Sequence, residues 1–255
     1  MVNIEKTIDM ILKGQIKIAQ PKIGYRFGFD SVFLASFVNG YIKNNNKKNN
    51  NKKKMLLADI GAGVGTISLI VGFKNLNIEI TAVENNEEYL KLAEENIFSN
   101  GLNNKIEMVN ENIFNINSKL INHFDIVVSN PPYHSAGGNL SNNILRDKAK
   151  RIINLEKWLQ ISISLLKHKG TLFIIFPAGI LHNVLKYLEK SSGSFRIFPF
   201  RPKQNSPAKR LILIAKKGGA GPTQLMSGLN LYNSKGFLTK QSQLISEKGI
   251  YNFNI

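Results

Sequence analysis

Apolar and polar residues alternate along the chain with two different periods, and these periods predict alternating strands and helices. Short apolar runs rich in branched residues, typical of buried strands, occur at 54–61, 77–84, 105–110, 123–130, 171–177 and 210–217. Helical spacing of apolar residues occurs at 64–75, 86–101 and 154–170. This alternation predicts an α/β fold with a doubly wound, mostly parallel sheet and helices on both faces.

Two segments fall outside this alternation. Residues 44–54 (NNNKKNNNKKK) are polar, basic and of low complexity, which predicts a solvated loop. Residues 218–255 begin with a Gly/Pro break and continue with weak alternation at 229–239, which predicts an extended, hairpin-like appendage. The chain therefore divides into an N-terminal extension (1–43), this Asn/Lys-rich loop, an α/β domain (55–217) and a C-terminal appendage.

Composition narrows the class of protein. With 255 residues, of which 43% are hydrophobic, the chain can bury a full core. It contains no cysteine, which excludes disulfides, thiolate metal ligands and cysteine nucleophiles. His123 and His168 lack a partner at ligand spacing, so we expect no metal site. No apolar run reaches the roughly 18 residues of a membrane span, and the first residues lack a signal-peptide core, so we expect a cytoplasmic protein.

The charge of the chain favours a polyanionic partner. The formal net charge is +17, from 34 Lys and Arg residues against 17 Asp and Glu residues. Such a charge attracts nucleic acid, because each phosphate that is neutralised releases counterions. A genome rich in A·T pairs would also enrich Lys over Arg, so the charge alone does not decide between the two explanations.

The first chemical motif is ADIGAGVGT, residues 58–66, in which three glycines follow a predicted strand and open a predicted helix. Glycines let the backbone approach a ligand closely. A dinucleotide fingerprint needs a further glycine at position 66, where this chain has Thr66. Asp59 precedes the first glycine, where a carboxylate would repel a diphosphate and attract a cation. The motif therefore suits a positively charged ligand.

Glu84 ends the next predicted strand, where a carboxylate can accept hydrogen bonds from both hydroxyls of a ribose. Together, Glu84, Asp59 and the glycine turn describe a site for S-adenosylmethionine, which carries an ammonium, a sulfonium and a nucleoside. The alternative is structural: Asp59 would cap the following helix, and Glu84 would be a solvated strand end.

DIGAGVG, Glu84 and NPPY, in this order and spacing, resemble the class I S-adenosylmethionine-dependent methyltransferases that methylate a planar amide or an exocyclic amine. Residues 24–38 (GYRFGFDSVFLASFV) and 208–225 (AKRLILIAKKGGAGPTQL) are similar to the terminal signatures of the bacterial methyltransferases that modify valine tRNA. Those enzymes methylate N6 of the adenosine next to the anticodon. The resemblance implies a Rossmann-like class I methyltransferase fold, with a mostly parallel seven-stranded sheet and a final antiparallel strand.

The resemblance also implies roles for single residues. S-adenosylmethionine would be bound along its methionine part by Asp59, Gly61, Gly63 and Gly65. Glu84 would hold the ribose. Asn112 stands where these enzymes usually carry an aspartate that accepts a hydrogen from the adenine amino group. An amide oxygen can also accept that hydrogen, and the neighbouring Glu111 is the alternative.

The stretch VVSNPPYH, residues 127–134, ends a predicted strand with an asparagine and two prolines. An exocyclic adenine nitrogen is a poor nucleophile, because its lone pair is delocalised into the ring. The side-chain oxygen of Asn130 and the carbonyl of Pro131 would accept its two hydrogens and localise that pair. Pro131 and Pro132 stop the strand and hold the acceptors rigidly. Tyr133 offers a face for an unpaired base, worth about 1 to 3 kcal/mol. An ordinary strand-ending turn is the alternative, which the upstream glycine motif disfavours.

Contacts with the substrate rest on composition. Arg26 could pair with a phosphate or cap the cofactor pocket, and Tyr25, Phe27 and Phe29 could form a lid in the N-terminal extension; packing of the aromatics against the first helix is the alternative. Residues 195–210 interleave aromatics and prolines with basic residues, a composition suited to single-stranded RNA. The candidates there are Arg201, Lys203 and Arg210. A solvated basic loop would have the same composition.

These features predict a tRNA adenosine N6-methyltransferase. The same NPPY chemistry fits two alternatives, N5-methylation of a protein glutamine and N2-methylation of an rRNA guanine. A non-catalytic RNA-binding module that retains the fold is an alternative of another class. The basic charge and the terminal signatures favour RNA over protein as the substrate, by analogy.

Overall fold

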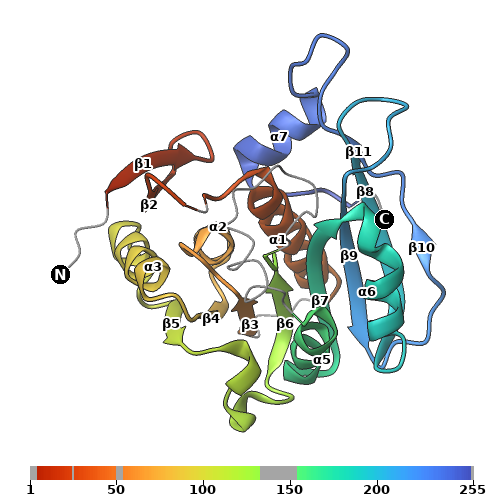
Figure 1. Ribbon diagram of the computed structural model, residues 1–255, viewed down its shortest axis with the longest axis horizontal. Helices are drawn as coiled ribbons and strands as arrows, with labels where there is room; N and C mark the ends of the chain where they lie inside the picture. The colour runs from red at the N-terminus through yellow and green to blue at the C-terminus, as the bar shows by residue number, and fades with distance from the viewer. Residues whose placement is uncertain (1–4, 25, 50–53, 133–153, 254–255) are drawn as a thin grey trace, which may run out of the picture.

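The computed structural model describes residues 5–24, 26–49, 54–132 and 154–253. The described residues form a nine-stranded sheet with helices packed on both of its faces (Figure 1). Its long strands are β3 (Met55–Ile60), β4 (Ile78–Glu84), β5 (Ile106–Asn110), β6 (Phe124–Ser129), β7 (Leu166–Pro177), β8 (Ser192–Arg201) and β9 (Arg210–Lys217). Two short strands, β10 (Gln224–Leu225) and β11 (Leu229–Asn230), both pair with β8.

The strand order is β5-β4-β3-β6-β7-β9-β8-β10, and the pairs from β5 to β7 are all parallel. β9 runs antiparallel to both β7 and β8. The predicted α/β fold, with a mostly parallel sheet and a late antiparallel strand, is therefore confirmed. The chain leaves β3 towards β5 on one side and returns to β6 on the other, so the order reverses between β3 and β6. Ligands of such sheets bind at the carboxyl ends of the strands beside this switch point.

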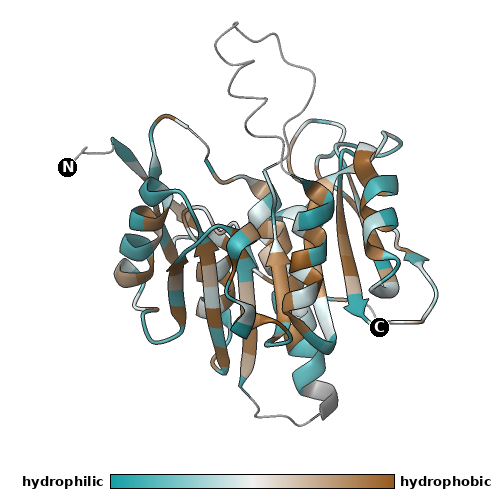
Figure 2. Cartoon of the chain, turned by 60° about the horizontal axis from the view of Figure 1, so that its bottom comes forward, coloured by the Kyte–Doolittle hydropathy of each residue, from teal (hydrophilic) through white to brown (hydrophobic). Residues whose placement is uncertain are grey.

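Helices cover both faces of the sheet. They are α1 (Phe29–Asn49), α2 (Thr66–Lys74), α3 (Glu87–Ser99), α5 (Leu155–Leu165), α6 (Leu181–Leu188) and α7 (Lys240–Lys248), with short 3-10 turns η1 (Ile113–Asn115), η2 (Ser118–Leu120) and η3 (Ala178–Ile180). The buried residues of α1, α2, α3 and α7 form one apolar cluster with one face of the strands, and those of α5 and α6 form a second cluster with the other face. Figure 2 shows hydrophobic residues along the strands in the middle of the molecule.

The N-terminal extension contains a hairpin that the sequence did not predict. β1 (Lys6–Ile11) pairs antiparallel with β2 (Ile16–Pro21), and the hairpin lies beside α3, across the molecule from β10 (Figure 1). The side chain of Asn96 in α3 bonds to both backbone groups of Ala19 in β2, as a neighbouring strand would. Its Oδ1 accepts from the Ala19 N–H at 2.6 Å, and its Nδ2 donates to the Ala19 carbonyl at 2.9 Å. This docking depends on a side chain far away in sequence.

The Asn/Lys-rich segment predicted as a loop is helical in its first part, because α1 continues to Asn49. The predicted helix at 154–170 also ends early, at Leu165, and β7 begins at Leu166. Leu166 pairs with Phe124 of β6, and the Lys217 Nζ donates to the Leu166 carbonyl at 2.8 Å. Pairing with a distant strand therefore overrides the local helical spacing.

The C-terminal appendage is only partly extended. Tyr232 and Leu238 form an antiparallel bridge, as a hairpin would, but α7 follows it. Thr239 caps α7 by accepting the Ser242 N–H at 3.2 Å, and Gly249 ends it in a left-handed conformation. None of the described helices is long and apolar enough to cross a membrane.

Candidate active site

A cavity of about 490 Å³ opens at the carboxyl ends of β3, β4, β5 and β6. It brings together predicted site residues from four separate segments. These are Gly61, Gly63, Glu84, Glu111, Asn112, Asn130 and Pro132. The cavity therefore lies where the strand order reverses, which is the ligand-binding position of a doubly wound sheet.

The glycine turn between β3 and α2 forms one wall of the cavity. Gly61, Gly63 and Gly65 all have positive φ, at 73°, 58° and 81°, a region that other residues rarely adopt. A Cβ on Gly61 would lie 3.1 Å from the ring of Trp158, whereas one on Gly63 would meet nothing within 4 Å. Gly65 precedes α2 and lies outside the cavity lining formed by the described residues. Gly61 is therefore needed for close packing as well as for the turn.

Glu84 is fixed in place by backbone N–H groups. Its Oε2 accepts from Gly63 at 2.9 Å, and its Oε1 accepts from Asn85 at 3.0 Å and from Asn86 at 2.9 Å. These bonds orient the carboxylate at the cavity before any ligand binds. A carboxylate has about four acceptor positions, so it can also accept from ligand hydroxyls. The alternative interpretation of Glu84 as a loose, solvated strand end does not fit these contacts.

Asp59 does not face the cavity lined by the described residues; its side chain is fully buried under α2. Its Oδ2 accepts from the Ser68 N–H at 3.2 Å and from the Ser68 hydroxyl at 2.7 Å. Burial raises the pKa of Asp59 to about 7; the Ser68 hydrogen bonds oppose this shift and the charge of Glu84 adds to it. These contacts fit the capping alternative, and they do not place Asp59 against the methionine part of a cofactor.

Asn130 follows the last residue of β6, where the two prolines end the strand. Its Nδ2 donates to the Ser31 hydroxyl oxygen at 3.2 Å. The preceding Ser129 donates from its hydroxyl to the Ile60 carbonyl at 2.8 Å, which ties the end of β6 to the glycine turn of β3. Pro131 is buried, and Pro132 is exposed at the cavity. Tyr133 and His134 lie outside the described residues.

Comparison with known proteins decides the family. Residues 44–188 match the family model described as methyltransferase small domain. The chain belongs to this family. It is therefore an S-adenosylmethionine-dependent methyltransferase, and S-adenosylmethionine is its cofactor.

Relatives of this methyltransferase extend over the whole chain. A protein of Mannheimia succiniciproducens named tRNA1(Val) (adenine(37)-N6)-methyltransferase is 25% identical over 262 residues, covering 99% of this chain and 98% of the relative. A protein of the same name from Trichodesmium erythraeum is 26% identical over 217 residues, covering 80% of this chain and 82% of the relative.

Solved structures share the fold of this methyltransferase. The structure of a predicted O-methyltransferase from Agrobacterium tumefaciens has a TM-score of 0.70 at 19% identity, covering 89% of this chain and all of that chain. The M. jannaschii TYW2 structure in complex with AdoMet has a TM-score of 0.52 at 16% identity, covering 85% and 87%. At these identities the likeness concerns the fold alone.

The far wall of the methyltransferase cavity is aromatic, and sequence reasoning missed it. Trp158 of α5 and Phe114 of η1 meet edge to face, with ring centroids 6.1 Å apart, and both line the cavity. The Trp158 Nε1 donates to the Ser129 hydroxyl at 3.1 Å. The sequence analysis assigned no site role to Trp158, although it is the only tryptophan of the chain. Phe114 stands two positions after Asn112, so a hydrophobic adenine site could have been sought there.

Both candidates for the adenine contact lie at this wall. Asn112 and Glu111 line the cavity, and the Asn112 Oδ1 accepts from the Phe114 N–H at 3.0 Å. An amide oxygen has two lone pairs, so Asn112 retains one acceptor position besides this bond. The geometry therefore leaves the choice between Asn112 and Glu111 open.

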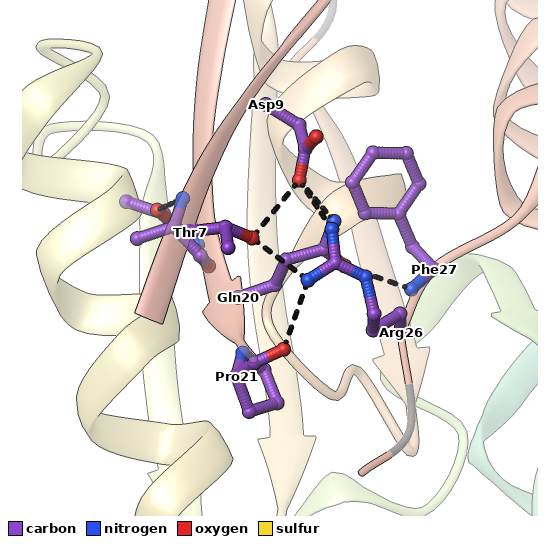
Figure 3. A network of polar contacts seen from close by, with 8 residues as sticks. Thr7, Asp9, Gln20, Pro21, Arg26 and Phe27 are labelled. Atoms are coloured by element: carbon purple, nitrogen blue, oxygen red, sulfur yellow. Dashed lines mark hydrogen bonds and ion pairs between the residues drawn. The ribbon is translucent and has the colours of Figure 1, made fainter. Parts of the chain in front are cut away.

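Arg26 lies away from the cavity and makes internal contacts with the β1–β2 hairpin (Figure 3). Its guanidinium donates to the Thr7 hydroxyl at 2.7 Å, to the Pro21 carbonyl at 3.0 Å and to the Asp9 carboxylate at 2.8 Å. Of the aromatics predicted to form a lid, Phe27 packs against the core and Phe29 stacks on Phe33, whereas Tyr25 lies outside the described residues. Arg26 thus has a structural role in this conformation, and the predicted capping of the cofactor pocket is not seen.

The other predicted substrate residues lie at the edge of the sheet that carries the cavity, although they do not line it in the described part of the chain. Arg201 ends β8 and donates to the Ser227 carbonyl at 3.0 Å. Arg210 begins β9 opposite Pro177, the last residue of β7, and pairs with Asp30 at 2.8 Å. Lys203 is exposed in the loop between these strands. Among the described residues, no group of three His, Asp or Glu side chains could hold a metal ion.

Proposed function

We propose that this methyltransferase transfers the methyl group of S-adenosylmethionine to the exocyclic N6 of an adenosine in tRNA. The observation that carries the proposal is the position of Asn130, which lines the same cavity as the glycine turn and Glu84. The relatives named for tRNA adenine N6-methylation support the substrate, because they align over most of the chain, and the Mannheimia succiniciproducens relative covers 99% of it.

The residues present fit the cofactor. A cavity of about 490 Å³ has the size of a small-molecule site, for which roughly 300 to 1,000 Å³ is usual. The bare backbone at Gly61 and Gly63 leaves room for the methionine part, and the fixed carboxylate of Glu84 suits ribose hydroxyls. Phe114 and Trp158 offer an apolar surface for the adenine ring. When bound, S-adenosylmethionine supplies an electrophilic methyl group, whose C–S bond breaks as the new N–C bond forms.

Asn130 would act on the nucleophile. Its side-chain oxygen would accept one hydrogen of the adenine amino group, and the carbonyl of Pro131 would accept the other. These bonds favour a tetrahedral nitrogen, which takes its lone pair out of conjugation with the ring and directs it towards the methyl group. The methylated nitrogen carries a positive charge and then releases one proton to solvent. Alignment of the two reacting atoms supplies much of the rate, which a rigid Pro-Pro segment favours.

The basic residues of β8, β9 and the loop between them would contact the RNA backbone. Arg201, Lys203 and Arg210 lie at the edge of the sheet where the cavity opens, and the chain carries a net charge of +17. Phosphate contacts of this kind position an RNA without reading its sequence. An adenosine in an anticodon loop is already partly unpaired, so bringing it to Asn130 costs less than extracting a base from a duplex.

The test is methylation of total tRNA with labelled S-adenosylmethionine, followed by nucleoside mass spectrometry. We expect N6-methyladenosine with the wild type and its loss with Asn130→Ala, while Asn130→Ala retains cofactor binding. Glu84→Ala should instead weaken cofactor binding itself, measured by calorimetry. Near-normal transfer by Asn130→Ala would refute the role of Asn130. Methylguanosine in rRNA or methylglutamine in protein, without methyladenosine, would replace the substrate with one of the alternatives.

A further inference from the structure

The first turn of α1 lies between two parts of the proposed active site. Its Asp30 accepts from the Nε of Arg210 in β9 at 2.8 Å. The next residue, Ser31, accepts from the Nδ2 of Asn130 at the end of β6 at 3.2 Å. Two consecutive residues of the N-terminal extension thus contact the sheet edge on either side of β7.

This turn of α1 is held rigidly against the sheet. Phe33 is buried and stacks on Phe200 of β8, with ring centroids 5.6 Å apart. Phe29 stacks in turn on Phe33 at 5.7 Å. Ser31 itself is 6% exposed, so its hydroxyl cannot move freely into solvent. The Ser31 hydroxyl is therefore fixed next to Asn130, whose Nδ2 donates to it.

The orientation of the Asn130 amide decides whether it can serve the proposed reaction. An amide has an accepting oxygen end and a donating nitrogen end. Only the oxygen end can accept a hydrogen from an adenine amino group, whereas the nitrogen end would place hydrogens against hydrogens. In the structure the nitrogen end donates to Ser31, so the oxygen end points away from Ser31. Asn130 lines the cavity, whereas Ser31 is not part of the lining formed by the described residues.

We propose that Ser31 is a positioning residue, which binds the nitrogen end of the Asn130 amide so that the oxygen end is the one that meets the substrate amine. The proposal rests on the proposed function, because it assigns Asn130 the task of accepting that hydrogen. The ion pair of Asp30 with Arg210 and the Phe33–Phe200 stack keep Ser31 in register with β6. A residue of the N-terminal extension therefore positions Asn130.

The experiment compares Ser31→Ala with Ser31→Thr under steady-state conditions, using tRNA and S-adenosylmethionine. Ser31→Ala should lower kcat about 10-fold to 100-fold, the size of effect that a misplaced reacting group has. The KM for S-adenosylmethionine should not change, because Ser31 does not touch the cavity. Ser31→Thr keeps the hydroxyl and should retain most of the turnover.

Ser36→Ala is the matched control. Ser36 lies in the same helix and is fully buried, but its hydroxyl donates to the Val32 carbonyl at 2.7 Å and does not reach Asn130. If the effect of Ser31→Ala were merely loss of helix stability, Ser36→Ala would lower kcat to the same extent. Equal turnover of Ser31→Ala and the wild type would overturn the proposal.

A second pair of variants covers the case in which Ser31→Ala does not fold. The variants Ser31→Thr and Ser31→Val have side chains of nearly the same shape, and only the threonine carries a hydroxyl. Turnover by Ser31→Thr but not by Ser31→Val supports the proposal, whereas equal turnover by both variants refutes it. Failure of the proposed function looks different, because the wild type itself would then methylate no adenosine. In that case the kcat of all variants on the true substrate decides whether Ser31 still positions Asn130.

Discussion

Replacement of Asp59 by asparagine should make the stability of the protein less dependent on pH. Asp59 is fully buried, and burial raises its pKa from 3.8 to about 7. A carboxyl group whose pKa is raised by folding stabilises the folded state below its unfolded pKa, and this contribution is lost as pH rises through the folded pKa. At about 1.4 kcal/mol per unit, a shift of this size corresponds to about 4 kcal/mol between pH 4 and pH 7.

The asparagine of this variant would be uncharged at every pH and could keep the two bonds from Ser68, because an amide oxygen accepts as a carboxylate does. We therefore expect Asp59→Asn to gain about 3 kcal/mol of unfolding free energy relative to the wild type between pH 5 and pH 8. Urea unfolding followed by the fluorescence of Trp158, the only tryptophan, measures this difference. Glu107→Gln removes an exposed charge from β5 and serves as the control. A difference that stays constant across this pH range would refute the reasoning.

Two further predictions follow from the positions of single residues. Gly61→Ala should destabilise the fold by at least roughly 1 to 2 kcal/mol, the cost of a left-handed conformation, and should weaken cofactor binding, because the new Cβ would also press on Trp158. Gly63→Ala has a similar backbone cost without that clash, so calorimetry of cofactor binding should separate the two variants. If they contact phosphates, Arg201 and Lys203 should each, when replaced by alanine, raise the KM for tRNA and reduce the salt dependence of that KM. Arg26→Ala should leave the KM and its salt dependence unchanged, because Arg26 pairs with Asp9; a rise in KM with this variant would show that the predicted phosphate contact exists.

Elements whose signal is local could be predicted from the sequence. β3, β6 and β9 are buried on both sides over most of their length, so each shows as a short apolar run bounded by polar residues or glycine. The β1–β2 hairpin was missed although its pairing is local, from Lys6 with Pro21 to Ile11 with Ile16; what its own sequence does not show is its docking on α3 through Asn96. The start of β7 was missed because Leu166 joins the sheet through Phe124.

The candidate site residues also differ in how well the sequence predicts their positions. Glu84 ends β4 and Asn130 follows β6, and these strands flank β3, so both residues lie at the carboxyl edge of the sheet beside the switch point. Asp59 was assigned to the cofactor because it also precedes the turn, but side chains alternate between the faces of a strand. Asp59 shares a face with Leu57, which packs in the cluster that α2 covers, while Ala58 and Ile60 face the other cluster. Counting positions along β3 would have placed the carboxylate under the helix.

We expect the choice of substrate to depend on parts of the chain that the family region does not include. The matched region, residues 44–188, contains the glycine turn, Glu84, Asn130 and Trp158, which line the same cavity. Ser31 precedes this region and Arg210 follows it, yet Asp30 and Ser31 connect Arg210 to Asn130. The Mannheimia succiniciproducens relative named for tRNA adenine N6-methylation covers 99% of this chain, so it aligns over these outer segments as well. We therefore expect the methyl transfer chemistry to follow from the common domain, and the selection of a tRNA adenosine to follow from the first turn of α1 and the β8–β9 edge that it braces.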